Sequence, residues 1–162
     1  MDIESLWFWL EGFGVSSLIR ESTWVFPVIE TLHVLTLAIT VGSIALLDFR
    51  LLGLGFDRRP VRTAAAEALP WTWGAFIATC LSGALMFASA ASYYVTIPAF
   101  RYKALCLALA GINMLVLHFG SWRELAAWDG DAQIPSEAKA AAALSLLFWG
   151  GVVVFGRWAG FY

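Results

Sequence analysis

Four long apolar stretches constrain this chain more than any other feature of its sequence. They cover residues at about 24–48, 71–95, 104–122 and 140–161, and each is dominated by aliphatic and aromatic side chains. About 20 mostly apolar residues are enough for an α-helix to cross ~30 Å of hydrocarbon. Because the stretches lack the alternation of polar and apolar residues that marks barrel strands, helices are favoured. We therefore predict an all-α protein, a polytopic membrane four-helix bundle.

The composition supports a membrane environment over water. Of the 162 residues, 60% are hydrophobic and 14% are charged, whereas soluble domains are roughly half apolar and about a quarter charged. A soluble domain of this length removes only roughly 70% of its surface from water, so the excess apolar surface needs lipid as its solvent. The net charge of −2 indicates no nucleic-acid partner. We expect a single membrane domain over residues 1–162, with the lipid bilayer as its surroundings.

The N-terminal segment, residues 1–21, differs from the four spans. It contains Trp7 and Trp9 among other apolar residues, but Glu11 and Gly12 interrupt the run. The segment lacks a basic start and a small-residue cleavage site, so a removable signal peptide is not expected. Tryptophan favours headgroup depth in a bilayer. An interfacial segment that lies along the membrane surface is predicted.

The connections between the spans indicate their order and orientation. Pro98 predicts a tight turn between the second and third spans, which should then be antiparallel neighbours. Cytoplasmic loops are enriched in basic residues, and the connection after the first span carries Arg50, Arg58, Arg59 and Arg62. On the opposite side the basic residues are Arg20, Arg101, Lys103 and Arg157. We expect a bacterial cytoplasmic (inner) membrane protein with both termini in the periplasm.

Few ionisable residues fall within the spans, and each is a candidate functional residue because burying a charge in lipid is costly. Glu30 and His33 lie in the first span, Lys103 opens the third, His118 closes it, and Arg157 lies in the fourth. At ~100° per residue, Glu30 and His33 share one stripe of their helix. Spans one and three run in the same direction and span four returns. Glu30, His33, Lys103 and Arg157 are therefore expected to converge in the outer half of the bundle.

The chemistry of these residues favours a haem b cofactor. Histidine supplies an axial nitrogen to haem iron, and basic side chains can pair with the propionates. His33 is the primary ligand candidate, and Glu30 could orient the imidazole or pair with Arg157. In the alternative interpretation, Glu30 and Arg157 form a buried ion pair and His33 is a hydrogen-bonded core residue. Lys103 would then extend its ammonium to the membrane surface.

The two histidines, His33 and His118, are the candidate metal ligands. His33 lies ~13 Å inside its span, whereas His118 lies ~22 Å along the helix from Lys103. One iron bound by both imidazoles would require similar depths, so separate roles are favoured. His118 either binds a second ligand or makes a hydrogen bond near Asn113.

Several short motifs resemble known families. The run Glu30-Thr31-Leu32-His33-Val34-Leu35, with Val41-Gly42 and Asp48-Phe49-Arg50-Leu51-Leu52-Gly53, resembles a widespread uncharacterised family of small bacterial four-helix membrane proteins. A more distant similarity is to HemJ-type protoporphyrinogen oxidases and CopD-type membrane domains. In both, a first-span histidine precedes a glycine by nine or ten residues.

The HemJ-type pattern also has a lysine that opens the third span and a histidine that closes it, as Lys103 and His118 do here. The resemblance implies His33 as a haem b ligand, Lys103 as a functional outer-side cation and Arg157 as a looser match to a late arginine. HemJ-type enzymes carry a basic residue where this chain has Glu30. Protoporphyrinogen oxidation is therefore not carried over.

Two classes of function follow. The first is a haem-b-binding membrane redox protein that exchanges electrons with quinone or acts on a porphyrin. The second is a non-enzymatic membrane subunit of a larger complex, with its polar residues making interhelical contacts. Small residues at Ala38, Gly42 and Ala45 form a face that another helix could approach closely. A homo-oligomer or a larger membrane complex is therefore expected.

Overall fold

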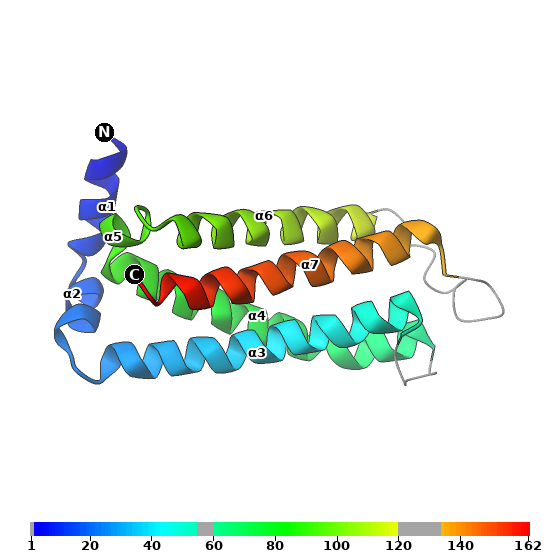
Figure 1. Cartoon of the computed structure of the whole chain (residues 1–162). Helices are drawn as coiled ribbons and strands as arrows, with labels where there is room; N and C mark the ends of the chain where they lie inside the picture. The colour runs from blue at the N-terminus through cyan, green and yellow to red at the C-terminus, as the bar shows by residue number, and fades with distance from the viewer. Residues whose placement is uncertain (1, 55–59, 120–133) are drawn as a thin grey trace.

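The described part of the chain is entirely helical, in agreement with the predicted fold class. The computed structural model describes residues 2–54, 60–119 and 134–162. Its helices, shown in Figure 1, are α1 (Ile3–Glu11), α2 (Gly14–Glu21), α3 (Val25–Leu52), α4 (Val61–Ser89), α5 (Ala91–Tyr94), α6 (Pro98–Phe119) and α7 (Ser136–Ala159). Four of them, α3, α4, α6 and α7, are long and apolar enough to cross a bilayer. The chain is thus a multi-pass membrane protein.

The boundaries of the second and third spans differ most from the prediction. The second was predicted from about residue 71 to 95, but α4 runs from Val61 to Ser89, and α5 forms the turn that follows. Residues 61–69 are rich in alanine, the strongest helix former, and Pro70 lies inside α4. The third span was predicted from about residue 104, but α6 begins at Pro98. Proline is well suited to a first helical position, where its missing N–H is not needed.

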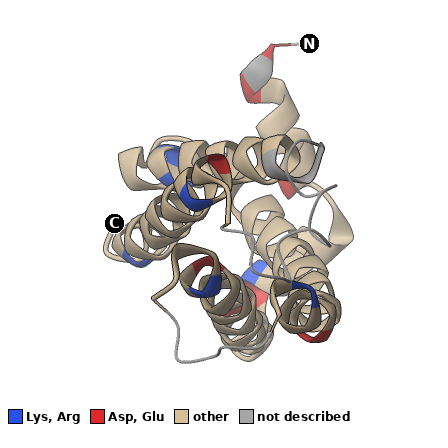
Figure 2. Ribbon diagram, turned by 90° about the vertical axis from the view of Figure 1, so that its right-hand side faces the viewer, with Lys and Arg blue, Asp and Glu red and all other residues tan. Residues whose placement is uncertain are grey.

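The bundle consists of two helix pairs. α3 packs along α4, α6 packs along α7, and contacts between α3 and α7 join the pairs. Figure 2, seen from the end opposite α1 and α2, shows these pairs and the few charged positions on them. Between the pairs, a core cluster includes Ala110, Trp149 and Val152. Phe76 from α4 meets Trp149 edge-on, with ring centroids 6.3 Å apart.

The expectation that the second and third spans are neighbours was wrong along most of their length. α4 and α6 run antiparallel but share almost no close contacts. They meet at the turn end, where Phe87 and Phe100 stack with centroids 5.4 Å apart. The reason lies in the glycines of α7, because Gly151 and Gly156 let the side chains of Cys106 and Lys103 approach the α7 backbone. α6 therefore packs on α7 instead of α4.

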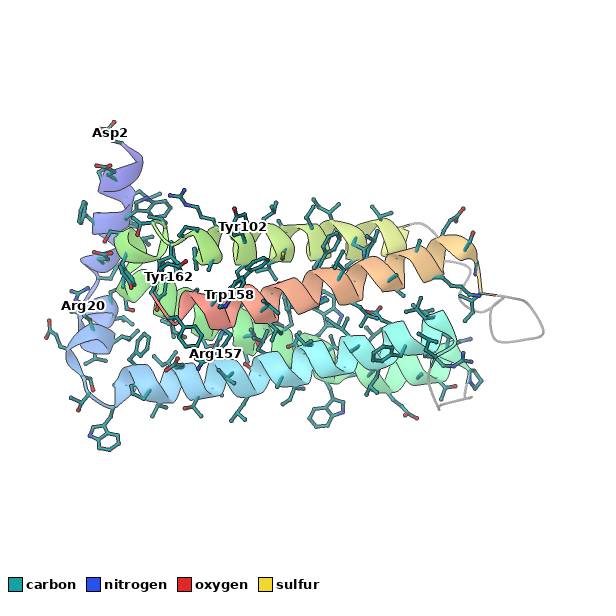
Figure 3. The ribbon with its side chains drawn as sticks, viewed as in Figure 1. Asp2, Arg20, Tyr102, Arg157, Trp158 and Tyr162 are labelled. Atoms are coloured by element: carbon teal, nitrogen blue, oxygen red, sulfur yellow. The ribbon has the colours of Figure 1, made fainter. Side chains whose placement is uncertain are left out.

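The N-terminal helices lie across one end of the bundle, as expected for an interfacial segment (Figure 1). Arg20 donates a hydrogen bond from Nη1 to the carbonyl oxygen of Ser89 at 3.0 Å. Ser92 donates from its backbone N–H and its hydroxyl to Glu11 Oε1, both at 2.7 Å. These two bonds lower the pKa of the Glu11 carboxyl below its ordinary value. Figure 3 shows that Arg20, Arg157, Trp158 and Tyr162 lie at this same end.

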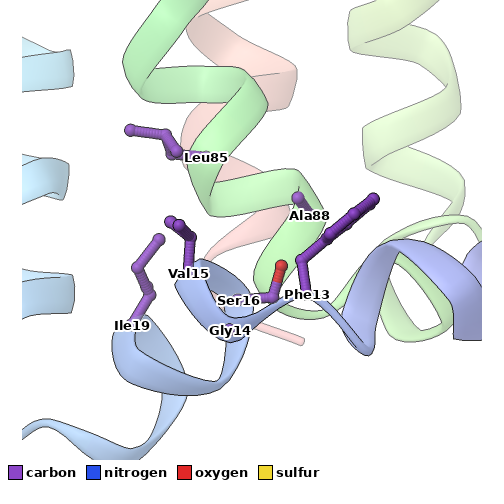
Figure 4. A pocket seen from close by; sticks show the side chains of 7 residues that line it. All are labelled: Phe13, Gly14, Val15, Ser16, Ile19, Leu85 and Ala88. Atoms are coloured by element: carbon purple, nitrogen blue, oxygen red, sulfur yellow. The ribbon is translucent and has the colours of Figure 1, made fainter.

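An apolar hollow of about 500 Å³ lies between α2 and α4 (Figure 4). Its lining residues are Phe13, Gly14, Val15, Ser16, Ile19, Leu85 and Ala88. The only side-chain hydroxyl among them, that of Ser16, already donates to the carbonyl oxygen of Leu10 at 2.8 Å. The hollow is therefore suited to an apolar group.

The contact between α6 and α7 predicts a stability effect at Gly151. A Cβ at this position would lie 2.7 Å from Cys106 Sγ. We expect Gly151→Ala to lower the free energy of unfolding by about 1–3 kcal/mol, the range for overpacking, and Cys106→Ala to rescue it. Gly150→Ala is the control, because a Cβ there meets nothing within 4 Å. Unfolding in detergent, followed by circular dichroism, measures the effect; equal stabilities of the two glycine variants would contradict it.

Candidate functional site

A row of hydroxyl groups aligns α3 with α4. Thr36 and Ser43 are seven residues apart on α3, and Thr72 and Thr79 are seven apart on α4. Seven residues make about two turns, so each pair lies on one face of its helix. In the antiparallel pair, Thr79 Oγ1 lies 2.9 Å from Thr36 Oγ1, and Thr72 Oγ1 lies 2.8 Å from Ser43 Oγ. These two contacts set the relative register of the helices.

His33 lies one turn before Thr36 and its imidazole contacts α4. Its Nδ1 is 3.1 Å from the carbonyl oxygen of Thr79 and 3.0 Å from Ser82 Oγ. A carbonyl oxygen can only accept, and the Ser82 hydroxyl donates to the carbonyl oxygen of Ala78 at 2.7 Å. Nδ1 must therefore carry the hydrogen, and the neutral imidazole keeps its lone pair at Nε2. Within residues 2–54, 60–119 and 134–162, no group hydrogen-bonds to Nε2.

Gly83 provides the space that this imidazole occupies. A Cβ at Gly83 would lie 3.0 Å from His33 Cε1 and 3.4 Å from Nδ1. The first distance is tighter than an ordinary van der Waals contact, so the ring would have to shift by a few tenths of an ångström to accept a side chain at Gly83. The glycine is thus part of the histidine site.

Lys103 approaches the same site from α6. Its stem packs against Gly156 of α7, where a Cβ would lie 3.5 Å from Lys103 Cδ and 3.7 Å from Nζ. The side chain is half-buried and lies close enough to His33 to interact with it electrostatically. Among the residues that the structure describes, its ammonium makes no hydrogen bond or ion pair. A cation in this state is available to an anionic ligand.

Glu30 and Arg157 lie at the same end of the bundle but are exposed. Burial raises the pKa of Tyr94, and the nearby Glu30 carboxylate raises it further. The Arg157 guanidinium lies over the Phe161 ring, 4.6 Å from its centroid. Across the described ranges, Glu30 neither pairs with Arg157 nor hydrogen-bonds to His33. Of the four residues predicted to converge, His33 and Lys103 are near enough to interact electrostatically, whereas Glu30 and Arg157 are exposed.

Two further polar residues of the spans are Asp48 and His118. Asp48 is buried near the other end of α3, where it hydrogen-bonds to Ser145, and its Oδ2 has no partner in the described part of the chain. His118 is in the last turn of α6, but its side chain lies outside the described residues. The separate roles of His33 and His118 stay a prediction.

The fold and this site define a small multi-pass membrane protein with a histidine and a lysine in the interior of a two-pair helical bundle. Residues 22–162 match a family described as a family of unknown function, DUF6644, and the chain belongs to this family. No curated protein and no solved structure matches it. The predicted membership in an uncharacterised family is confirmed, whereas no similarity to HemJ-type or CopD-type proteins is found.

Proposed function

We propose that this chain is a haem-b-binding integral membrane redox protein, with His33 as the axial ligand. One observation carries the proposal: His33 Nδ1 is hydrogen-bonded to the Thr79 carbonyl, which leaves the Nε2 lone pair uncommitted. Histidines that ligate metals almost always donate their other ring N–H to a carbonyl or carboxylate in this way. Among the described residues no three metal-ligating side chains come together, but haem iron takes only one or two protein ligands.

The neighbouring residues have separate tasks in this proposal. Thr79 and Ser82 hold the tautomer and the orientation of the His33 ring. Lys103 supplies a positive charge for a propionate, and Arg157 is the remaining candidate for the second. Glu30 lies at the rim, where its charge is exposed. When bound, the haem would supply one-electron chemistry, with a potential set by its axial ligand and surroundings.

The electron partner and the location are part of the same proposal. The apolar hollow between α2 and α4 lies at the His33 end of the bundle and supports exchange of electrons with a membrane quinone. Alternatively, the haem-binding protein would act on a porphyrin substrate in place of exchanging electrons with quinone. The arginines at positions 58, 59 and 62 support a cytoplasmic-membrane location with periplasmic termini. The site would then lie in the periplasmic half.

A second candidate function is that of a non-enzymatic subunit of a membrane complex. It is favoured by the contacts of His33 themselves, because bonds to Thr79 and Ser82 also join α3 to α4. Association with further copies or with other proteins stays a prediction, supported by the exposed face of α3 that carries Ala38 and Gly42.

A haem titration separates the two candidates. The protein purified in lipid nanodiscs should develop a Soret band that saturates at one haem b per chain. We expect Lys103→Met to weaken this binding by about 10–100-fold, the value of a charge-assisted hydrogen bond. Lys139→Met is the matched control, since Lys139 is exposed at the start of α7. Equal affinities would remove Lys103 from the site, and failure of the wild type to bind would favour the subunit.

A further inference from the structure

A groove of about 1040 Å³ runs between α3 and α4 on the outside of the bundle, near the end opposite His33. Small residues line it from both helices: Ala38 and Gly42 from α3, and Ala64 and Ala68 from α4. Ala38 and Gly42 are exposed, and a Cβ at Gly42 would meet nothing within 4 Å. Each helix thus presents two small residues four positions apart, the spacing that lets another helix approach closely in a membrane.

Opposite charges line the part of the groove that is farthest from His33. Arg50 projects from α3 and Glu67 from α4. The hydrogen bond between Thr72 and Ser43 sets the register of the two helices. Arg50 lies seven residues after Ser43 on α3, and Glu67 lies five residues before Thr72 on α4. Because the helices are antiparallel, Arg50 and Glu67 lie within about one helical turn of each other along the bundle. The groove therefore has a positive side on α3 and a negative side on α4 at nearly the same level.

We infer that this groove is the docking surface for a second copy of the chain. A two-fold axis along the membrane normal would place α3 of one copy opposite α4 of the other. Arg50 of each copy would then face Glu67 of the other copy, so the same contact would form twice, as a symmetric interface requires. Both side chains also have partners within their own chain, so the dimer adds contacts to groups that are already paired. Such a dimer would form with or without a bound cofactor.

Dimerisation in lipid bilayers tests the inference, with single-molecule photobleaching as the readout. Gly42→Leu fills the groove and is expected to weaken the dimer by about tenfold or more. Gly150→Leu is the matched control, because Gly150 is an exposed glycine of α7 whose Cβ would also meet nothing within 4 Å. Arg50→Glu and Glu67→Arg should each weaken the dimer, and the two changes together should restore it.

A crosslinking measurement tests the dimer without these substitutions, any of which could disturb the folding of the chain. With Cys80 and Cys106 replaced by serine, Ala38→Cys should crosslink between copies, whereas Leu147→Cys, exposed on α7, should not. A wild-type monomer at every protein-to-lipid ratio, or equal dimerisation of the two leucine variants, would overturn the inference. A monomer that loses bound phospholipid on Gly42→Leu would assign the groove to lipid instead and would also overturn it.

Discussion

Replacement of His33 by alanine is expected to abolish haem binding while the chain still inserts into the membrane. His33 contributes the imidazole whose Nδ1 is held by Thr79 and whose Nε2 has no hydrogen-bond partner among the described residues. Loss of a group that merely supports a metal ligand costs about 10–100-fold in affinity, so loss of the ligand itself should cost more than about 100-fold. Haem content per chain, measured by absorbance on matched detergent-purified samples, gives the result.

Leu32→Ala is the control for this substitution, because Leu32 precedes His33 on the same helix and half of its surface is exposed. It should retain the haem content and the membrane yield of the wild type. Unchanged haem content in His33→Ala would remove His33 from the ligand role, and the proposed function would lose its central residue. His118→Ala is expected to leave the His33 haem in place, since the two histidines are assigned separate roles.

Gly83→Val should produce the second large effect by displacing the ring without removing it. The new side chain would begin 3.0 Å from His33 Cε1, and the imidazole would lose its bonds to Thr79 and Ser82. We expect haem affinity to fall by about 10–100-fold, the typical cost of losing the groups that orient a metal ligand. Gly74→Val, on the same helix with open space at its Cβ, should bind like the wild type.

A second readout of the same variant does not require the cofactor. Solid-state NMR of ¹⁵N-histidine should show His33 protonated at Nδ1 in the wild type and in Gly74→Val. In Gly83→Val the Nδ1 and Nε2 signals should shift, since the hydrogen bond to the Thr79 carbonyl is lost. A wild-type ring protonated at Nε2 would contradict the orientation on which the site is built.

The fold could be predicted from the sequence because apolar length decides how many helices cross a bilayer. The first span was predicted to end near residue 48, but α3 continues to Leu52 and is followed by Gly53 with a positive φ of 74°, a common way to end a helix. The start of α4 was not predicted either, because its first turns combine alanines with Arg62 and Glu67 and carry little apolar signal. Helix propensity, not hydropathy, extends the helix there.

The site was predictable in part. His33 and Lys103 stand out because ionisable groups are rare in spans, and in the structure they are near enough to interact electrostatically. The α4 residues around His33 were missed, since which helix a side chain meets depends on packing that one sequence does not state. A usable signal existed in the seven-residue spacing of Thr36 with Ser43 and of Thr72 with Thr79. Two matching hydroxyl pairs indicate that α3 and α4 share a polar seam.

The absorption spectrum of the wild-type protein shows whether the chain carries haem b. The chain should be purified from membranes of cells that produce haem, without added cofactor, and its spectrum recorded before and after reduction. We predict a Soret band corresponding to one haem b per chain, together with sharpened α and β bands on reduction. A colourless, folded preparation that also takes up no haem on titration would contradict it.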